Sequence, residues 1–185
     1  MKKRIMATVV KSFAIQGIEG HNVDIETKIL DGQPMTSIIG MGDTAVKESA
    51  DRIQSAIDES GYVFPKKRVI ISLAPGDVKK RGSHYDLAMA IGVLQEDNNI
   101  AAKDLHQYAF IGELCLDGGL RACCGILPMI LAAKQSGIKK VIIPEVDTEE
   151  AKLVQGIEIL GFSKLTDVIR FLEGKEKFED RIKKS

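Results

Sequence analysis

Residues 110–144 read FIGELCLDGGLRACCGILPMILAAKQSGIKKVIIP, a run that combines two strands with one helix. YAFIGELCL, from residue 108, predicts a strand that ends in the turn at 117–119, Asp-Gly-Gly. The apolar segment from Ile126 to Gln135 predicts a helix. Ser136 and Gly137 end it, because glycine is preferred just after a helix. KKVIIP then predicts a second strand, and strand, helix and strand in this order are typical of α/β proteins.

The alternation continues on both sides of this run. On the C-terminal side TEEAKLVQ predicts a helix, IEILGF a strand and LTDVIRFLEG a last helix. On the N-terminal side MTSIIGM predicts a short buried strand and RVIISLAP an inner strand. Residues 44–60 predict a helix with Asp43 or Thr44 as its cap and Gly61 after its end. A further helix is expected from about Tyr85.

A β-hairpin is expected before the first helix, within residues 5–30. Val23, Ile25 and Thr27 alternate with charged residues, which is the pattern of a half-buried strand, and Gly17 and Gly20 mark a turn before it. Because a hairpin precedes the alternating units, we predict an α/β (α+β) sandwich with a mixed β-sheet and helices. A purely parallel, doubly wound sheet is not expected.

Length and composition fit one globular domain. The chain has 185 residues, 44% hydrophobic and 28% charged, with 26 basic and 26 acidic residues, so any nucleic-acid surface must be local. No apolar run is long enough for a membrane span, and Lys11 interrupts the N-terminal apolar segment, unlike a signal peptide. Cys115, Cys123 and Cys124 make a poor disulfide framework. We expect a cytoplasmic protein with reduced thiols and no membrane partner.

Four segments resemble one known family when they are taken in order. They are FAIQGIEGHNVDIETKILDGQP, IIGMGDTAVKESADRIQSAI, ISLAPGDVKKRGSHYDLAMAIGVL and the run from residue 110 to 144. Together they resemble the N-terminal domain of the ComM/YifB family of magnesium-chelatase-related AAA+ ATPases. They are also similar to the proteolytic domain of Lon, whose pattern aligns without gaps onto Gly112–Pro144, and to the C-terminal domain of RadA/Sms. The resemblance implies a Lon proteolytic-domain-like, or ribosomal-protein-S5-domain-2-like, fold.

The resemblance also implies a place within a larger protein. It makes residues 1–173 the Lon-like domain and leaves 174–185 as a charged tail or linker toward an AAA+ module. The implied protein is a homo-hexameric ring that remodels DNA by branch migration during recombination of incoming DNA. ATP and magnesium would bind the AAA+ module, since this chain has no G-x-x-x-x-G-K-[ST] sequence and Gly174–Lys175 lacks its context. We therefore expect no cofactor in this chain.

The catalytic pair of Lon is degenerate here. A Lon-type protease needs a serine nucleophile and a lysine that accepts its proton. By the resemblance, the serine position falls on His84 and the lysine position on Met129, which cannot accept a proton. Ser83 lies one residue earlier but still lacks its lysine. We predict a non-catalytic domain; a Lon-type serine peptidase and a magnesium-chelatase-like subunit remain as alternatives. Asp86 is interpreted as a first-turn or capping residue of a helix, in preference to a catalytic residue.

Two basic clusters are the candidate contacts to nucleic acid. One is Lys66, Lys67 and Arg68, and the other is Lys79, Lys80 and Arg81 in the loop GDVKKRGS. Lys and Arg on loops suit phosphate contacts without sequence reading, whereas most charge runs are only solvated turns. No metal site is expected, because the three histidines do not share ligand spacing.

Overall fold

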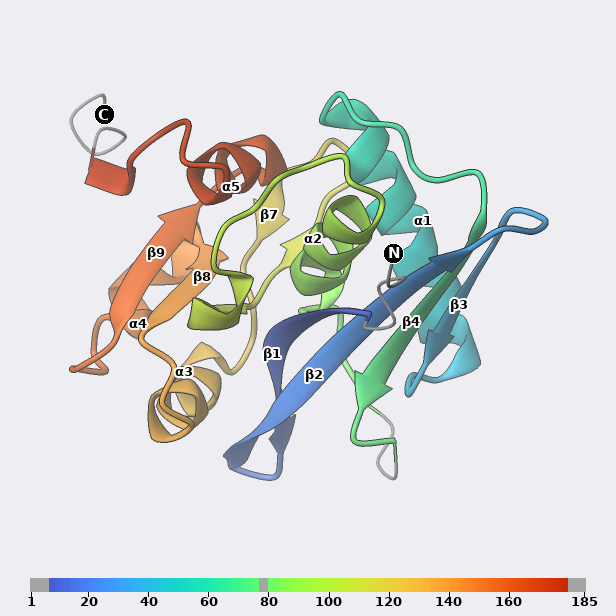
Figure 1. Ribbon diagram of the computed structural model, residues 1–185. Coiled ribbons are helices and arrows are strands. Elements are labelled where there is room, and N and C mark those ends of the chain that lie inside the picture. The colour runs from blue at the N-terminus through green and yellow to red at the C-terminus, as the bar shows by residue number, and fades with distance from the viewer. Residues whose placement is uncertain (1–6, 77–79, 180–185) are drawn as a thin grey trace, which may run out of the picture.

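The computed structural model describes residues 7–76 and 80–179 and contains a seven-stranded sheet with helices packed on it (Figure 1). The strands are β1 (Thr8–Gln16), β2 (Glu19–Leu30), β3 (Met35–Ile39), β4 (Arg68–Ala74), β5 (Tyr108–Phe110), β6 (Glu113–Leu114), β7 (Leu120–Arg121), β8 (Lys140–Pro144) and β9 (Glu158–Phe162). The α-helices are α1 (Asp43–Glu59), α2 (Asp86–Glu96), α3 (Ile126–Gln135), α4 (Thr148–Ala151) and α5 (Leu165–Leu172).

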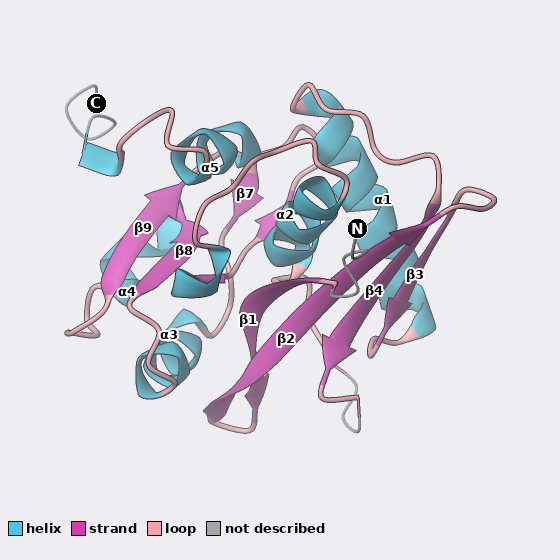
Figure 2. Ribbon diagram, viewed as in Figure 1, coloured by secondary structure: helices cyan, strands magenta, loops and turns pink. Residues whose placement is uncertain are grey.

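The sheet is mixed, as the sequence predicts. Its strand order is β3-β4-β2-β1-β5-β8-β9, and β6 and β7 form a separate two-stranded sheet. β2 is antiparallel to both β1 and β4, while β3 runs parallel to β4. β5, β8 and β9 are parallel to one another and to β1. The antiparallel hairpin therefore joins a parallel βαβ half, which gives the predicted α/β sandwich with its mixed sheet (Figure 2).

Helices cover both faces of the sheet, and each face has its own core. Alternate residues of β8 separate the two cores: Ile142 packs with α1, α2 and α5, whereas Val141 and Ile143 pack with α3 and α4. α2 is buried along its whole apolar length, from Asp86 to Leu94. This helix lies in the middle of the molecule, so its first turn is held firmly.

Local features differ from the sequence predictions at four places. β3 is an edge strand, with Met35 and Ile39 exposed, because only β4 lies beside it. The strand expected at YAFIGELCL is broken, since the chain leaves the main sheet after Phe110 and pairs again in β6. α4 has a single turn. Neither Asp43 nor Thr44 caps α1; the N-cap is Gly42, with no side-chain hydrogen bond.

The C-terminal segment packs on the domain. Phe178, within the segment expected to be a tail, packs on Phe162 with 5.6 Å between ring centroids. The domain contacts therefore extend past residue 173, and residues 180–185 lie outside the described part of the chain. Among the described helices, none is long and apolar enough to cross a membrane.

Candidate functional site

The loop between β4 and α2 is fixed to the sheet at two points. The Lys80 backbone N–H donates to the Gly40 carbonyl oxygen at 2.7 Å, which joins the loop to the end of β3. Further along, Gly112 N–H donates to the His84 carbonyl oxygen at 2.8 Å, and Leu87 N–H donates to the Gly112 carbonyl oxygen at 3.0 Å. These bonds hold the start of α2 against the chain that follows β5.

His84, which the resemblance assigns to the position of the Lon serine, has its imidazole ring bonded to the backbone. Its Nε2 lies 2.7 Å from the Phe13 carbonyl oxygen, and since a carbonyl only accepts, Nε2 carries the proton. Burial lowers the pKa of His84 below its ordinary value, against the opposing effect of the Phe13 hydrogen bond. The ring also lies on Tyr85, with centroids 4.0 Å apart. Position 84 therefore supplies no hydroxyl nucleophile.

Met129, which the resemblance assigns to the position of the Lon lysine, is part of an apolar core. It is fully buried on α3, in the cluster that also contains Phe13, Ile111 and Ile126. Phe13 links the two degenerate positions, because its ring packs in the Met129 cluster while its carbonyl oxygen accepts from His84. Both positions thus lie near Phe13 of β1, and neither holds the serine hydroxyl or the lysine amine of a Ser–Lys dyad.

A buried ion pair beneath this site was not anticipated from the sequence. Asp86 is fully buried and accepts two hydrogen bonds from Arg52 of α1, Nε to Oδ2 at 2.6 Å and Nη2 to Oδ1 at 3.2 Å. Its Oδ2 also accepts from the Leu114 backbone N–H at 3.1 Å, and Arg52 donates to Ser49 Oγ. Asp86 lies in the first turn of α2, as predicted, but its carboxylate makes no cap and instead joins α1, α2 and β6.

Arg52 and Asp86 each shift the pKa of the other toward its charged form. The hydrogen bond to Asp86 raises the pKa of Arg52, while burial raises the pKa of Asp86 against the opposing effect of Arg52 and the Leu114 N–H. A carboxylate without its guanidinium would be very unfavourable at this depth. The sequence signal is only an acid and a base 34 positions apart, so no local pattern could find the pair.

The two predicted basic clusters lie at opposite ends of β4. Lys66, Lys67 and Arg68 are exposed at its start, and the Lys67 Nζ lies 3.6 Å from Asp31. The six strand residues 69–74 separate this cluster from the second loop, a distance of about 20 Å along the strand. Arg81 is exposed there, but Lys80 is only 5% exposed, and Lys79 lies outside the described residues. The structure therefore does not bring the two clusters together into one basic surface.

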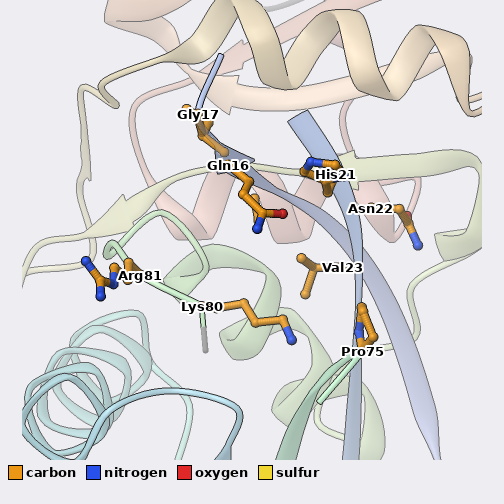
Figure 3. A pocket seen from close by; sticks show the side chains of 10 residues that line it. Gln16, Gly17, His21, Asn22, Val23, Pro75, Lys80 and Arg81 are labelled. Carbon is orange, nitrogen blue, oxygen red and sulfur yellow. The ribbon is translucent and has the colours of Figure 1, made fainter. Parts of the chain in front are cut away.

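A cleft of about 750 Å³ lies between the end of the β1–β2 hairpin and the loop after β4 (Figure 3). Figure 3 shows Lys80 extending toward Pro75 and Gln16 pointing into the same space. Gly20 positions the hairpin, because a Cβ there would lie 2.5 Å from the Pro128 carbonyl oxygen of α3. The cleft is lined by Ala14, Ile15, Gln16, Gly17, His21, Asn22, Val23, Pro75, Lys80 and Arg81.

The possible metal ligands and the cysteines are the remaining candidates for a reactive site among the described residues. Residues 7–76 and 80–179 contain no group of three or more His, Cys, Asp or Glu side chains arranged to hold a metal ion. The three cysteines are free thiols. Burial is the main cause that raises the pKa of Cys123 to about 12, so this thiol stays protonated.

Comparison with known proteins gives one family. The family described as "Subunit ChlI of Mg-chelatase" matches residues 25–147. The chain is 37% identical over 169 residues to competence protein ComM of Haemophilus influenzae, covering 91% of this chain and 33% of ComM. It is 37% identical over 172 residues to the uncharacterized protein YifB of Escherichia coli, covering 93% and 34% of the two chains. A Lon protease of Lachnoclostridium phytofermentans is 29% identical over 175 residues, covering 88% and 21%.

Proposed function

Because the chain belongs to the magnesium-chelatase-related family of ChlI, ComM and YifB, we propose that it is the non-catalytic, Lon-like accessory domain of a hexameric, DNA-remodelling AAA+ ATPase. The chain spans about a third of the length of the ComM and YifB relatives, which leaves space in such proteins for a motor module. ATP and magnesium would bind that module. The proposed partners are the motor, five further copies of the protein, and DNA in the cytoplasm.

The observation that carries the non-catalytic role is the pair of substitutions at the Lon dyad. His84 is held by a backbone carbonyl, and Met129 lies in a dry apolar core. No side chain at either position can form the activated serine that this peptidase chemistry needs. Ser83 precedes α2, and its carbonyl oxygen accepts the Asp86 N–H, so it too belongs to the turn that starts the helix.

We expect the chain to cleave no peptide. Incubation with casein or with fluorogenic peptides should give the rate of the buffer alone, because Met129 stands at the position that the resemblance assigns to the activating lysine. Ser83→Ala serves as the control, since it removes the serine hydroxyl that adjoins His84 in sequence. Cleavage by the parent chain that disappears in Ser83→Ala would make the domain a serine peptidase and exclude the accessory role.

The DNA contact is proposed from the exposed cations. Lys66, Lys67 and Arg68 are exposed side by side at the start of β4, and Arg81 is exposed at the far end of that strand. Lys79 and Lys80 complete the second cluster in sequence. Such contacts neutralise phosphates without reading bases, so they fit a machine that acts on any DNA sequence.

We predict weak, salt-dependent binding of DNA by the chain. A labelled duplex should bind with a dissociation constant of roughly 10⁻⁴ to 10⁻⁶ M in fluorescence anisotropy. The variant Lys66→Ala/Lys67→Ala/Arg68→Ala should bind all sequences more weakly and reduce the salt slope by up to about 3, one per phosphate contact.

Three exposed lysines elsewhere on the domain provide the matched control. Lys139→Ala/Lys152→Ala/Lys164→Ala removes the same charge and should change affinity less. Equal losses in both variants would show that only net charge matters. If the first variant binds as well as the parent, the cluster at 66–68 is a solvated turn and takes no part in DNA binding.

A further inference from the structure

A hollow of about 380 Å³ lies at the start of β4, beside the exposed cations at 66–68. The connection from α1 to β4, which can be followed in Figure 1, forms one wall of it. The beginning of β3 and the second half of α1 form the others. All residues that line this hollow belong to the described part of the chain, so its walls are well defined.

Two large apolar side chains of the hollow are open to solvent. Met35 is 58% exposed and Val63 is 67% exposed, although apolar side chains gain free energy when they are removed from water. Phe64 lines the same hollow and is half-buried, because it also packs on the core. The hollow therefore presents apolar surface and one aromatic ring, which a flat apolar ligand would cover.

Polar side chains share the hollow with these apolar ones. Gln54 and Asp58 line it from α1, and Thr36 lines it from β3. Asp58 Oδ1 accepts the Phe64 backbone N–H at 3.4 Å, which ties the connection to α1. A ligand that matches this lining needs apolar faces together with edges that donate and accept hydrogen bonds. A nucleobase has both.

The neighbouring cations complete the chemistry of a nucleic-acid site. Lys66 and Lys67 line the hollow, and Arg68 follows them in the chain. The pair of Lys67 with Asp31 is exposed on both sides, so it holds the ammonium only weakly. Phosphates can therefore lie on these cations while a base enters the hollow. An apolar side chain of a protein partner would use neither the cations nor the polar groups of the lining.

We propose that this hollow receives an unpaired base of single-stranded DNA, whose phosphates lie on Lys66, Lys67 and Arg68. The inference rests on the DNA contact proposed above and names the form of DNA that this surface prefers. A duplex reaches the cations but keeps its bases stacked and paired, so it leaves the hollow unfilled. Charge alone favours the duplex, because its phosphates are more closely spaced. A preference for single strands must therefore come from the bases, and contact with base faces tolerates any sequence.

Three ligands with equal numbers of phosphates test the role of the base in fluorescence anisotropy with the full chain. They are a mixed-sequence single strand, a duplex, and a single strand in which stable abasic sugars replace the nucleosides. The normal single strand should bind about tenfold more tightly than either of the others, because only it can place a base in the hollow. Equal binding of the abasic and normal strands, or of the duplex and the single strand, would overturn the proposal.

Variants of the chain test the location. Met35→Ala/Val63→Ala truncates two side chains that are more than half exposed, so the fold should be kept. It should weaken single-strand binding about tenfold and leave duplex binding within about twofold. Val146→Ala/Leu153→Ala is the matched control, because these side chains are 70% and 74% exposed and lie outside the hollow. The control should leave both affinities within about twofold, and unchanged single-strand binding in Met35→Ala/Val63→Ala would contradict the proposed site.

The same measurements separate this inference from the DNA contact itself. If Lys66→Ala/Lys67→Ala/Arg68→Ala changes binding of neither form of DNA, the contact is wrong and the base site with it. If that variant weakens both forms while Met35→Ala/Val63→Ala weakens neither, only the base site is wrong. Light scattering covers the other occupant: self-association that disappears in Met35→Ala/Val63→Ala, with single-strand binding unchanged, would assign the hollow to a second copy of the chain and overturn the proposal.

Discussion

Arg52→Met should lower the free energy of unfolding by about 3–5 kcal/mol, the usual effect of removing one partner of a buried ion pair. The substitution leaves the Asp86 carboxylate fully buried, with the Leu114 N–H and the Ser49 hydroxyl as its remaining hydrogen-bond partners. Asp86 joins α1, α2 and β6, so three elements lose a shared contact at once. In a domain of this size the melting temperature should fall by about 6–20 °C.

Urea unfolding measured by circular dichroism gives the free energies. Arg170→Met is the matched control, because the Nε of Arg170 contacts Glu176 at 3.4 Å with the arginine side chain 54% exposed; this substitution should cost less than about 1 kcal/mol. The double variant Arg52→Met/Asp86→Leu should recover part of the loss, since it removes the buried charge as well. A change below about 1 kcal/mol in Arg52→Met would show that Asp86 is already neutral or reached by water.

The sequence predicts those elements whose signals are local. α3 runs from Ile126 to Gln135, as the apolar pattern and the glycine after it indicate. The hairpin of β1 and β2 follows from the alternation in residues 23–29, and Gly61 follows α1 with a positive φ of 89°. In each case the residues that decide the structure are neighbours in the chain, so periodicity and glycine placement are enough.

Features that depend on distant residues were missed. The strand predicted at YAFIGELCL is broken because Gly112 bonds to the backbone of His84 and Leu87, which lie far away in sequence. MTSIIGM is apolar enough for a buried strand, yet its position at the sheet edge is set by the strand order. Arg52 lies off the apolar stripe of α1 in the sequence pattern, yet its guanidinium reaches the buried Asp86 carboxylate. A charged residue on a helix gives no local sign of its partner.

The assignment of the Lon dyad positions to His84 and Met129 comes from the resemblance and stays a prediction. In the structure both residues lie near Phe13 of β1. The cleft was not predicted, because it forms between a hairpin end and a loop about 60 residues apart. The burial of Lys80 was also missed: three consecutive cations suggest a solvated loop, but Lys80 lies against the end of β3.

Met129→Lys should destabilise the domain by at least about 3 kcal/mol at neutral pH, because it introduces an unpaired ammonium into an apolar core. Burial would lower the pKa of the new lysine in the folded state below its value of about 10.4 in the unfolded chain. The unfolded state then binds the extra proton, so the stability lost at pH 7 should return in part as the pH rises toward about 10. Urea unfolding at pH 7 and pH 9.5 measures both effects.

Two control substitutions distinguish the effect of the new charge from the effect of changing residue 129. Met129→Leu keeps the volume and should cost less than about 1.5 kcal/mol. Leu131→Lys places the same ammonium on the same helix at a residue that is 47% exposed, and it should change stability by less than about 1 kcal/mol. If Met129→Lys is as stable as Leu131→Lys at pH 7, water reaches position 129. The position would then suit the lysine that activates a Lon-type serine, and the dry core would no longer support a non-catalytic domain.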